Sequence, residues 1–308
     1  MIRAKDIHKT YRSEFLRRKT LALRGVTLHV REGEIYGFVG VNGAGKSTFI
    51  KIALGMVKAT KGGISVLGEA PGFAPARSKI GYLPEQTLFP HYWTARDFLA
   101  DAARVRGIEG AEAEKRINEL LERVSLTQHA ERKIVEFSKG MQQRLGIAVC
   151  LLARPKILIL DEPMSGLDPL GRREVRNILL GEKKRGVTVF FSSHIFTDVE
   201  AVADRIGVLH KGKLIKETTA SDMFLAGVKS GVEISLPPLD EETMAQLKPF
   251  AAETLTDGKG SALKTDSLEQ YEKLMDALMK KRIAPRRVDL VKPSLDDLFA
   301  EAIAEAEQ

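Results

Sequence analysis

The chain has 308 residues, a net charge of +7 and 44% hydrophobic residues, enough for one large α/β domain and a smaller second one. Its single cysteine, Cys150, excludes an internal disulfide, fits a reducing compartment and lies in an apolar stretch that predicts burial. We expect neither secretion nor membrane insertion, because charged residues open the chain and its longest apolar run, 145–152, is far too short to span a bilayer.

Charge is distributed unevenly along the chain. After Ala220 there are 11 basic and 17 acidic residues, so all of the net positive charge belongs to the preceding segment. This asymmetry predicts two domains, 1–219 and 220–308. The basic segment has no interleaved aromatic and basic pattern of the kind that binds single-stranded nucleic acid, and we expect no nucleic-acid partner.

Strands and helices alternate along the predicted first domain. Short apolar runs predict strands at 2–6, 26–30, 35–39, 63–67, 80–83, 157–160, 188–192 and 205–209. Helical spacing predicts helices at 49–57, 95–126, 138–153, 169–184 and 195–203, the second of them broken at Gly107 and Gly110. The alternation favours a mostly parallel sheet covered on both faces, with a helical insert at about 95–153.

A glycine-rich loop, GVNGAGKST at 40–48, follows the strand at 35–39. It matches the pattern Gly-x4-Gly-Lys-Ser/Thr between a strand and a helix, as in phosphate-binding P-loops. Such a loop directs N–H groups at phosphates, while Lys46 supplies a positive charge and Ser47 a hydroxyl ligand for Mg²⁺. The candidate nucleotide-binding residues here are Gly40, Asn42, Gly43, Ala44, Gly45, Lys46, Ser47 and Thr48.

Two carboxylates end the apolar strand at 157–160. Ligands of parallel sheets bind at the carboxyl ends of the strands, where Asp161 and Glu162 would lie. We predict that Asp161 holds Mg²⁺ opposite Ser47 and that Glu162 accepts a proton from, or orients, the attacking water. A solvated pair at a helix start is the alternative for these two residues taken alone.

The segment FSKGMQQR at 137–144 makes the pattern more specific. It resembles the signature motif of the ATP-binding cassette (ABC) family, usually written LSGGQ, and lies between the helical insert and the Asp161 strand. Ser138 and Gly140 can present a hydroxyl and N–H groups to a phosphate at a helix start. In the family that phosphate belongs to ATP held by the other subunit, so the resemblance implies a head-to-tail dimer, either a homodimer or a pair with a second ATPase subunit.

Further landmarks of the ABC family follow in order. The resemblance covers 1–219 and implies a P-loop NTPase fold, in which an antiparallel β subdomain and a helical subdomain join the mostly parallel sheet. Residues 165–168 match the D-loop, whose Asp168 would reach the dimer interface, and His194 matches the switch histidine that contacts the γ-phosphate. Glu162, His194 and Lys46 are thus the implied catalytic residues. Tyr11 lies where the family places an aromatic ring against adenine, although a packed tyrosine at a strand end is an alternative.

One position departs from the family pattern. The glutamine of the family's Q-loop usually follows the proline of a Tyr-x-Pro segment, whereas here Pro84 is followed by Glu85 and then Gln86. We align Glu85 with the Q-loop residue, as a Mg²⁺ or water ligand, but either residue could take the role. An ionised glutamate only accepts hydrogen bonds, so it could not donate as an amide does.

The C-terminal part predicts a small α+β accessory domain. Strands are expected at 232–236 and 287–291, and helices at 241–250, at 268–281 and from Ser294 onward. Its ending resembles the accessory segment of ABC-2-type exporters. Dimerisation, regulation and coverage of an exposed sheet edge remain open as its role.

The resemblance implies an ATPase, with ATP and Mg²⁺ as cofactors, that energises a separate integral-membrane permease subunit from the inner face of the cell membrane. The chain would then be cytoplasmic and peripherally bound. The apolar run 88–93, next to the helical insert, could be the permease contact or could be buried. Two alternatives remain: a soluble ABC ATPase acting on a macromolecular assembly such as the ribosome or DNA, and a P-loop kinase, which would leave FSKGMQQR and His194 unexplained.

Overall fold

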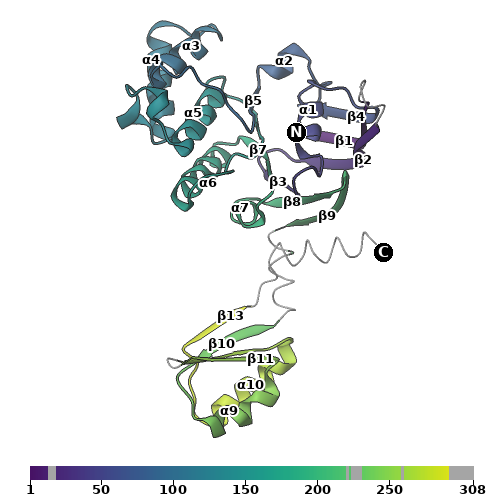
Figure 1. The fold of residues 1–308 in the computed structure, drawn as a ribbon, viewed down its shortest axis with the longest axis vertical. Coiled ribbons are helices and arrows are strands. Elements are labelled where there is room, and N and C mark those ends of the chain that lie inside the picture. The colour runs from purple at the N-terminus through teal and green to yellow at the C-terminus, as the bar shows by residue number, and fades with distance from the viewer. Residues whose placement is uncertain (13–18, 220–221, 223–230, 258–259, 291–308) are drawn as a thin grey trace. The chain divides into compact units, whose positions relative to one another are not determined.

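The computed structural model describes residues 1–12, 19–219, 222, 231–257 and 260–290 (Figure 1). These residues form two compact units, one running from Met1 to Glu217 and the other beginning at Thr218. Within the described ranges, none of the helices combines the length and apolar character needed to cross a bilayer.

A mostly parallel sheet forms the centre of the first unit, as predicted. In the described part of the chain it has six strands in the order β5-β6-β7-β3-β8-β9. Their bounds are β5 Ile80–Leu83, β6 Ile157–Leu160, β7 Thr188–Ser193, β3 Ile35–Val39, β8 Arg205–His210 and β9 Lys213–Thr219. The four pairings from β5 through to β8 are parallel, which brings the carboxyl ends of these strands to one edge. Strand β9 was not predicted.

A smaller antiparallel sheet is built from β2 (Lys19–Val30), β1 (Ile2–Arg12) and β4 (Lys61–Val66), in that order. The first two strands extend well beyond the predicted 2–6 and 26–30. Asp6 explains the difference in β1, because its positive φ of 53° and the register shift between Ala4 and Ile7 interrupt the alternation of inward and outward residues. The alternation of buried and exposed residues therefore stops at Asp6, although the strand itself continues beyond the kink.

Helix α1 (Lys46–Ala53) contacts β2 and β4 of the antiparallel sheet, and its Phe49 packs with aromatic residues of the parallel one. The rings of Phe49, Phe38 and Phe190 lie 5.2 to 5.9 Å apart, and Tyr36 stacks on Phe190 at 5.7 Å. Such contacts fix α1, and with it the loop at its start, against the centre of the domain.

The helical insert is confirmed as α3 (Ala95–Arg104), α4 (Gly110–Arg123) and α5 (Lys139–Leu151), which lie together in Figure 1. The predicted break falls at Gly107 and Gly110, which have φ angles of 70° and 60°. Among the described residues of this unit, the remaining α-helices are α6 (Pro169–Lys184), α7 (Phe196–Glu200) and the short α2 (Ala74–Arg77), which was not predicted.

The second unit is α+β, as predicted. Its described elements are β10 (Val232–Leu236), α9 (Glu241–Leu247), β11 (Glu253–Asp257), β12 (Gly260–Lys264), α10 (Leu268–Lys280) and β13 (Arg287–Leu290), with sheet order β11-β12-β10-β13. The hairpin of β11 and β12 was missed because its sequence is mostly polar and only part of it faces the core. The predicted helix from Ser294 lies outside the described residues.

Candidate nucleotide site

The loop before α1 has the geometry of a phosphate cradle. Gly45 precedes the helix with φ of 113°, and a Cβ at this position would lie 2.6 Å from the backbone oxygen of Ala22, so only glycine fits. No side chain caps the N–H groups of the first turn, and no acidic residue lies in that turn. Free N–H groups at the positive end of a helix bind anions such as phosphate.

Lys46 is 6% exposed and lies at the meeting point of the P-loop and β6. Its Nζ donates to the backbone oxygen of Gly40 at 2.7 Å and lies 3.1 Å from Oε1 of Glu162, which is also 6% exposed. Two charges this deeply buried are tolerated because they pair with each other. A phosphate at the start of α1 would meet both groups.

The carboxylates after β6 are held by a residue of the neighbouring strand. Ser192, fully buried at the end of β7, accepts a hydrogen bond from the Glu162 N–H at 3.0 Å and donates one to Oδ1 of Asp161 at 2.6 Å. Glu162 itself has a left-handed backbone with φ of 52°. A non-glycine residue in that region costs about 1 to 3 kcal/mol and is typical of functional sites.

Sequence reasoning assigned no role to Ser192. The available signal was its position at the carboxyl end of a buried strand, two residues before His194. That signal is weak until the sheet order is known, because only the pairing of β6 with β7 places the hydroxyl beside Asp161 and Glu162.

His194 completes the cluster. Its Nδ1 lies 2.7 Å from Oε2 of Glu162, and its backbone N–H donates to the same oxygen at 3.3 Å. Because an ionised carboxylate only accepts hydrogen bonds, Nδ1 carries the proton in this contact. The structure thus brings Lys46, Glu162 and His194, the three predicted catalytic residues, into one chain of contacts, with Asp161 beside them through Ser192.

The other predicted P-loop residues surround this cluster. Ser47 and Thr48 are partly exposed in the first turn of α1, Ala44 is buried, and Asn42 and Gly43 are exposed at the tip of the loop. Ser47 and Asp161 carry the kind of oxygen ligands that Mg²⁺ prefers, and such ions usually retain waters and substrate phosphates as further ligands.

Ser138 and Asp168 occupy two neighbouring helix starts. Ser138 Oγ accepts from the N–H of Met141 at 3.3 Å and caps α5, while Asp168 Oδ1 accepts from the N–H of Gly171 at 2.9 Å and caps α6. The two helices meet closely, since a Cβ on Gly140 would lie 3.8 Å from the Cα of Gly171. Both capping residues are exposed, so a second molecule could reach them.

Three predicted residues lie at the periphery of this arrangement. Tyr11 lies in β1, 39% exposed, with Nζ of Lys9 5.0 Å from the centre of its ring. Glu85 and Gln86 are both exposed in the loop after β5, so the geometry does not choose between them. Nearby, burial and the charge of Asp161 raise the pKa of Tyr82.

Known proteins with similar sequences belong to one family, the ABC transporters, whose motifs coincide with this site. The sequence model of the ABC transporter family matches residues 23–165, which span the P-loop, the signature segment and both carboxylates. The chain is 34% identical to the bacitracin transport ATP-binding protein BcrA of Bacillus licheniformis, over 98% of this chain and 97% of that protein. It is 32% identical to the linearmycin resistance ATP-binding protein LnrL of Bacillus subtilis, with 97% of each covered.

Solved structures resemble the first unit. A dimeric post-hydrolysis state of an ATP-binding cassette bound to ADP and Pi superposes with a TM-score of 0.65 at 27% identity, covering 71% of this chain and 99% of that one. The ATP-binding subunit of an ABC transporter superposes with a TM-score of 0.63 at 31% identity, covering 73% and 92%.

Proposed function

Because the chain belongs to the family of ABC transporter ATP-binding proteins, we propose that it binds and hydrolyses ATP to energise a membrane transporter. The observation that carries the proposal is the chain of contacts from Lys46, at the start of α1, through the buried carboxylate of Glu162 to the partly exposed His194. A general-purpose phosphate loop would need only the first of these three residues.

The phosphates of ATP would bind the N–H groups at the start of α1. Lys46 would then exchange its contact with Glu162 for the β- and γ-phosphates, which leaves the carboxylate free to receive a proton. We assign Ser47 and Asp161 to Mg²⁺, with Glu85 as a further ligand, and Tyr11 to the adenine ring. When bound, Mg²⁺ would neutralise charge on the phosphate oxygens.

Glu162 is the proposed general base, and its surroundings fit the role. The hydrogen bond to the Ser192 hydroxyl and the left-handed φ position the backbone of Glu162, and the contact with His194 Nδ1 positions one of its carboxylate oxygens. The other oxygen, now on Lys46, would accept the proton of the attacking water. Positioned bases of this kind contribute about 10²- to 10⁴-fold to the rate.

A single copy of the chain supplies half of the nucleotide site in this proposal. The exposed, capped starts of α5 and α6, at Ser138 and Asp168, would contact ATP held by the P-loop of a second ATPase subunit, most simply another copy of this chain. The dimeric cassette among the similar structures, which holds ADP and Pi, supports this arrangement. Binding of ATP would close the dimer, and hydrolysis would open it.

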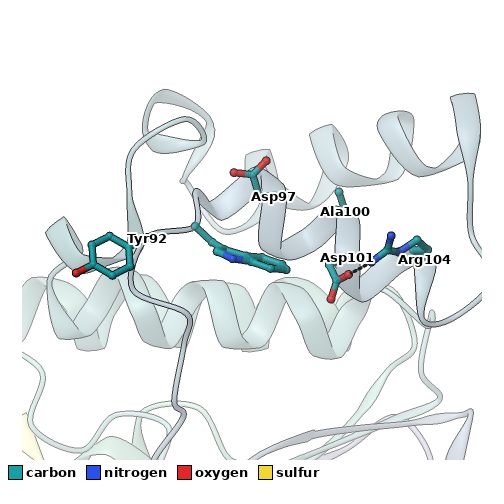
Figure 2. Close-up of a pocket in the computed structure, with 6 residues that line it drawn as sticks. Tyr92, Asp97, Ala100, Asp101 and Arg104 are labelled. Carbon is teal, nitrogen blue, oxygen red and sulfur yellow. Dashed lines mark hydrogen bonds and ion pairs between the residues drawn. The ribbon is translucent and has the colours of Figure 1, made fainter.

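The transporter also needs a membrane partner, and we place its contact at the start of α3. A cavity of about 450 Å³ lies there, and Figure 2 shows Asp97, Asp101 and Arg104 on the helix that lines it. Tyr92, Trp93 and Ala100 also line the cavity, and the two aromatic side chains are 83% and 38% exposed. Exposed aromatic residues and arginine are enriched at protein interfaces.

Some residues of the run 88–93 are exposed and could contact a permease, and others are buried in the domain. Leu88 is 93% exposed, whereas Phe89 is buried and packs edge-to-face on Phe98 with ring centres 5.2 Å apart. The exposed members are therefore free for a partner while Phe89 anchors the loop. We infer that the subunit sits at the inner face of the membrane through this surface.

We propose an exporter as the transporter, similar to the ABC-2 type. The names of two relatives, one in bacitracin transport and one in linearmycin resistance, support this reading. A soluble ABC ATPase is the second candidate. Affinity purification of the tagged chain from detergent-solubilised membranes distinguishes the two, because only the exporter subunit should retain a multi-span membrane protein at constant stoichiometry.

The catalytic part of the proposal is tested by Glu162→Gln. The amide keeps the size of the side chain but cannot accept a proton, so turnover should fall by about 10² or more while MgATP binding persists. Size-exclusion chromatography with MgATP should show the variant as a dimer. Hydrolysis at the wild-type rate would show that Glu162 is not the base.

A further inference from the structure

Asp198 is a buried carboxylate that the proposed mechanism does not use. It lies on α7, four residues after His194, and its side chain is 2% exposed. Oδ2 lies 3.5 Å from an Nη of Arg172 and Oδ1 lies 3.5 Å from an Nη of Arg176, both on α6. Burial raises the pKa of Asp198, and the guanidinium groups of Arg172 and Arg176 oppose that rise.

Arg172 has a second contact that Arg176 lacks. Its Nε donates to the backbone oxygen of Leu167 at 3.1 Å, within the segment 165–168 that leads into α6. One side chain therefore touches both this segment and the helix that follows His194. The fork of a guanidinium group suits such a bridge, because its donors point in fixed, different directions.

The contacts close a ring through the nucleotide site. Glu162 begins the ring, since its backbone oxygen accepts from the N–H of Ser165 at 3.1 Å and so fixes the start of the segment. The segment binds Arg172, Arg172 faces Asp198, and α7 leads back to His194, which contacts Glu162 at 2.7 Å. A displacement of the segment thus reaches His194 by a route outside the nucleotide site.

Helix α7 is held firmly enough to transmit such a displacement. Val199 packs into the space left by Gly37 of β3, where a Cβ would lie 2.1 Å from its Cγ1. This packing fixes one side of α7 on the strand that leads into the P-loop. The other side is fixed by Asp198, so the position of His194 depends on both.

We propose that Arg172 is a positioning residue that couples segment 165–168 to His194 through Asp198, so that the partner subunit bound at this segment sets the alignment of His194 with Glu162. The inference rests on the proposed ATPase and on its dimer interface at Asp168. Arg172 touches no reacting atom in this account, and its effect is on the geometry of those that do.

The chain offers a matched control. Arg172 and Arg176 lie one turn apart on α6, are 29% and 28% exposed, and are equally distant from Asp198. Arg172→Gln and Arg176→Gln therefore each remove one positive charge from beside Asp198. They differ in that only Arg172→Gln also loses the contact with Leu167. A purely structural role predicts that Arg172→Gln, which also loses the hydrogen bond to Leu167, is less stable than Arg176→Gln but has the same kcat.

The two variants are compared by melting temperature, MgATP affinity, and kcat and KM for ATP hydrolysis. We expect Arg172→Gln to melt slightly lower than Arg176→Gln, because it also loses the hydrogen bond to Leu167, and both variants to keep the ATP affinity of the wild type. The kcat should fall about tenfold in Arg172→Gln and by less than about threefold in Arg176→Gln, as for a misplaced catalytic group. Equal kcat values in the two variants would overturn the proposal. A wild-type chain without ATPase activity would instead overturn the proposed function, and this inference with it.

Asp198→Asn supplies an independent measurement. If Arg172 acts through Asp198, the double variant Arg172→Gln/Asp198→Asn should hydrolyse ATP no slower than Arg172→Gln alone, because residues of one network are not additive. If the loss of kcat in the double variant equals the product of the losses in the two single variants, the residues act separately and the coupling does not exist.

Discussion

Replacement of Ser192 by alanine is the most direct perturbation of the site that leaves every proposed catalytic group in place. The hydroxyl is fully buried, accepts a hydrogen bond from the backbone N–H of Glu162 and donates one to Oδ1 of Asp161. Alanine removes both hydrogen bonds without adding bulk. Because the position is fully buried, we expect no water to take over the contacts.

The size of the effect follows from the two bonds. A hydrogen bond to a charged group contributes about 1.5 to 3 kcal/mol, and a buried N–H left without a partner costs a similar amount. We therefore expect a loss of about 3 kcal/mol in the free energy of unfolding. At about 2 to 4 °C per kcal/mol for a domain of this size, the melting temperature should fall by roughly 6 to 12 °C.

Turnover should fall as well, by about tenfold or more, because Glu162 loses the bond that holds its strained backbone in place. Thermal unfolding and steady-state ATP hydrolysis measure the two effects. Thr188→Val is the control: Thr188 Oγ1 accepts from the N–H of Gly33 at 2.8 Å at the opposite end of β7. It should lose stability and keep its turnover. An unchanged melting temperature of Ser192→Ala, or an equal loss of activity in the two variants, would contradict the proposed role of Ser192.

Three further predictions concern other parts of the first unit. Lys46→Ala should weaken MgATP binding by about 10- to 100-fold, since a charged hydrogen bond is lost, and unchanged affinity in a titration would exclude Lys46 from the site. Gly37→Ala should destabilise the chain by about 1 to 3 kcal/mol through its clash with Val199, and Val199→Ala in the same chain should recover part of that loss in thermal melts. Burial raises the pKa of Cys150 from 9.0 to about 12, so a thiol reagent at pH 8 should label the protein only in denaturant. Because the folded pKa is the higher one, stability should decrease as the pH rises from about 9 toward 12, and rapid labelling of the native chain would contradict the burial.

Much of the candidate site could be predicted because its residues lie in short, contiguous motifs. The P-loop from Gly40 to Thr48 and the pair Asp161 and Glu162 each depend on a local transition from strand to loop, which sequence patterns record well. Ser192 escaped prediction, and so did the function of Arg172 and Asp198, because their importance comes from neighbours that are distant in sequence. The missed strands β9, β11 and β12 have the same cause, since β-pairing rather than local pattern stabilises them.

The sequence alone predicted the parts of the proposed site: a phosphate loop, a carboxylate for Mg²⁺, a base and, through the resemblance to the ABC family, two helix starts that face a second subunit. The first three predictions rest on residue types at fixed local spacing, which fold in the same way wherever they occur. Only the tertiary structure decided how the pieces act together. The order β6-β7-β3 brings Glu162 into contact with both Ser192 and Lys46, which lie 30 residues after it and 116 residues before it in the chain. Helices α6 and α7 connect segment 165–168 to His194. Such contacts depend on which strands and helices become neighbours, and that is fixed by the packing of the whole core rather than by any one segment.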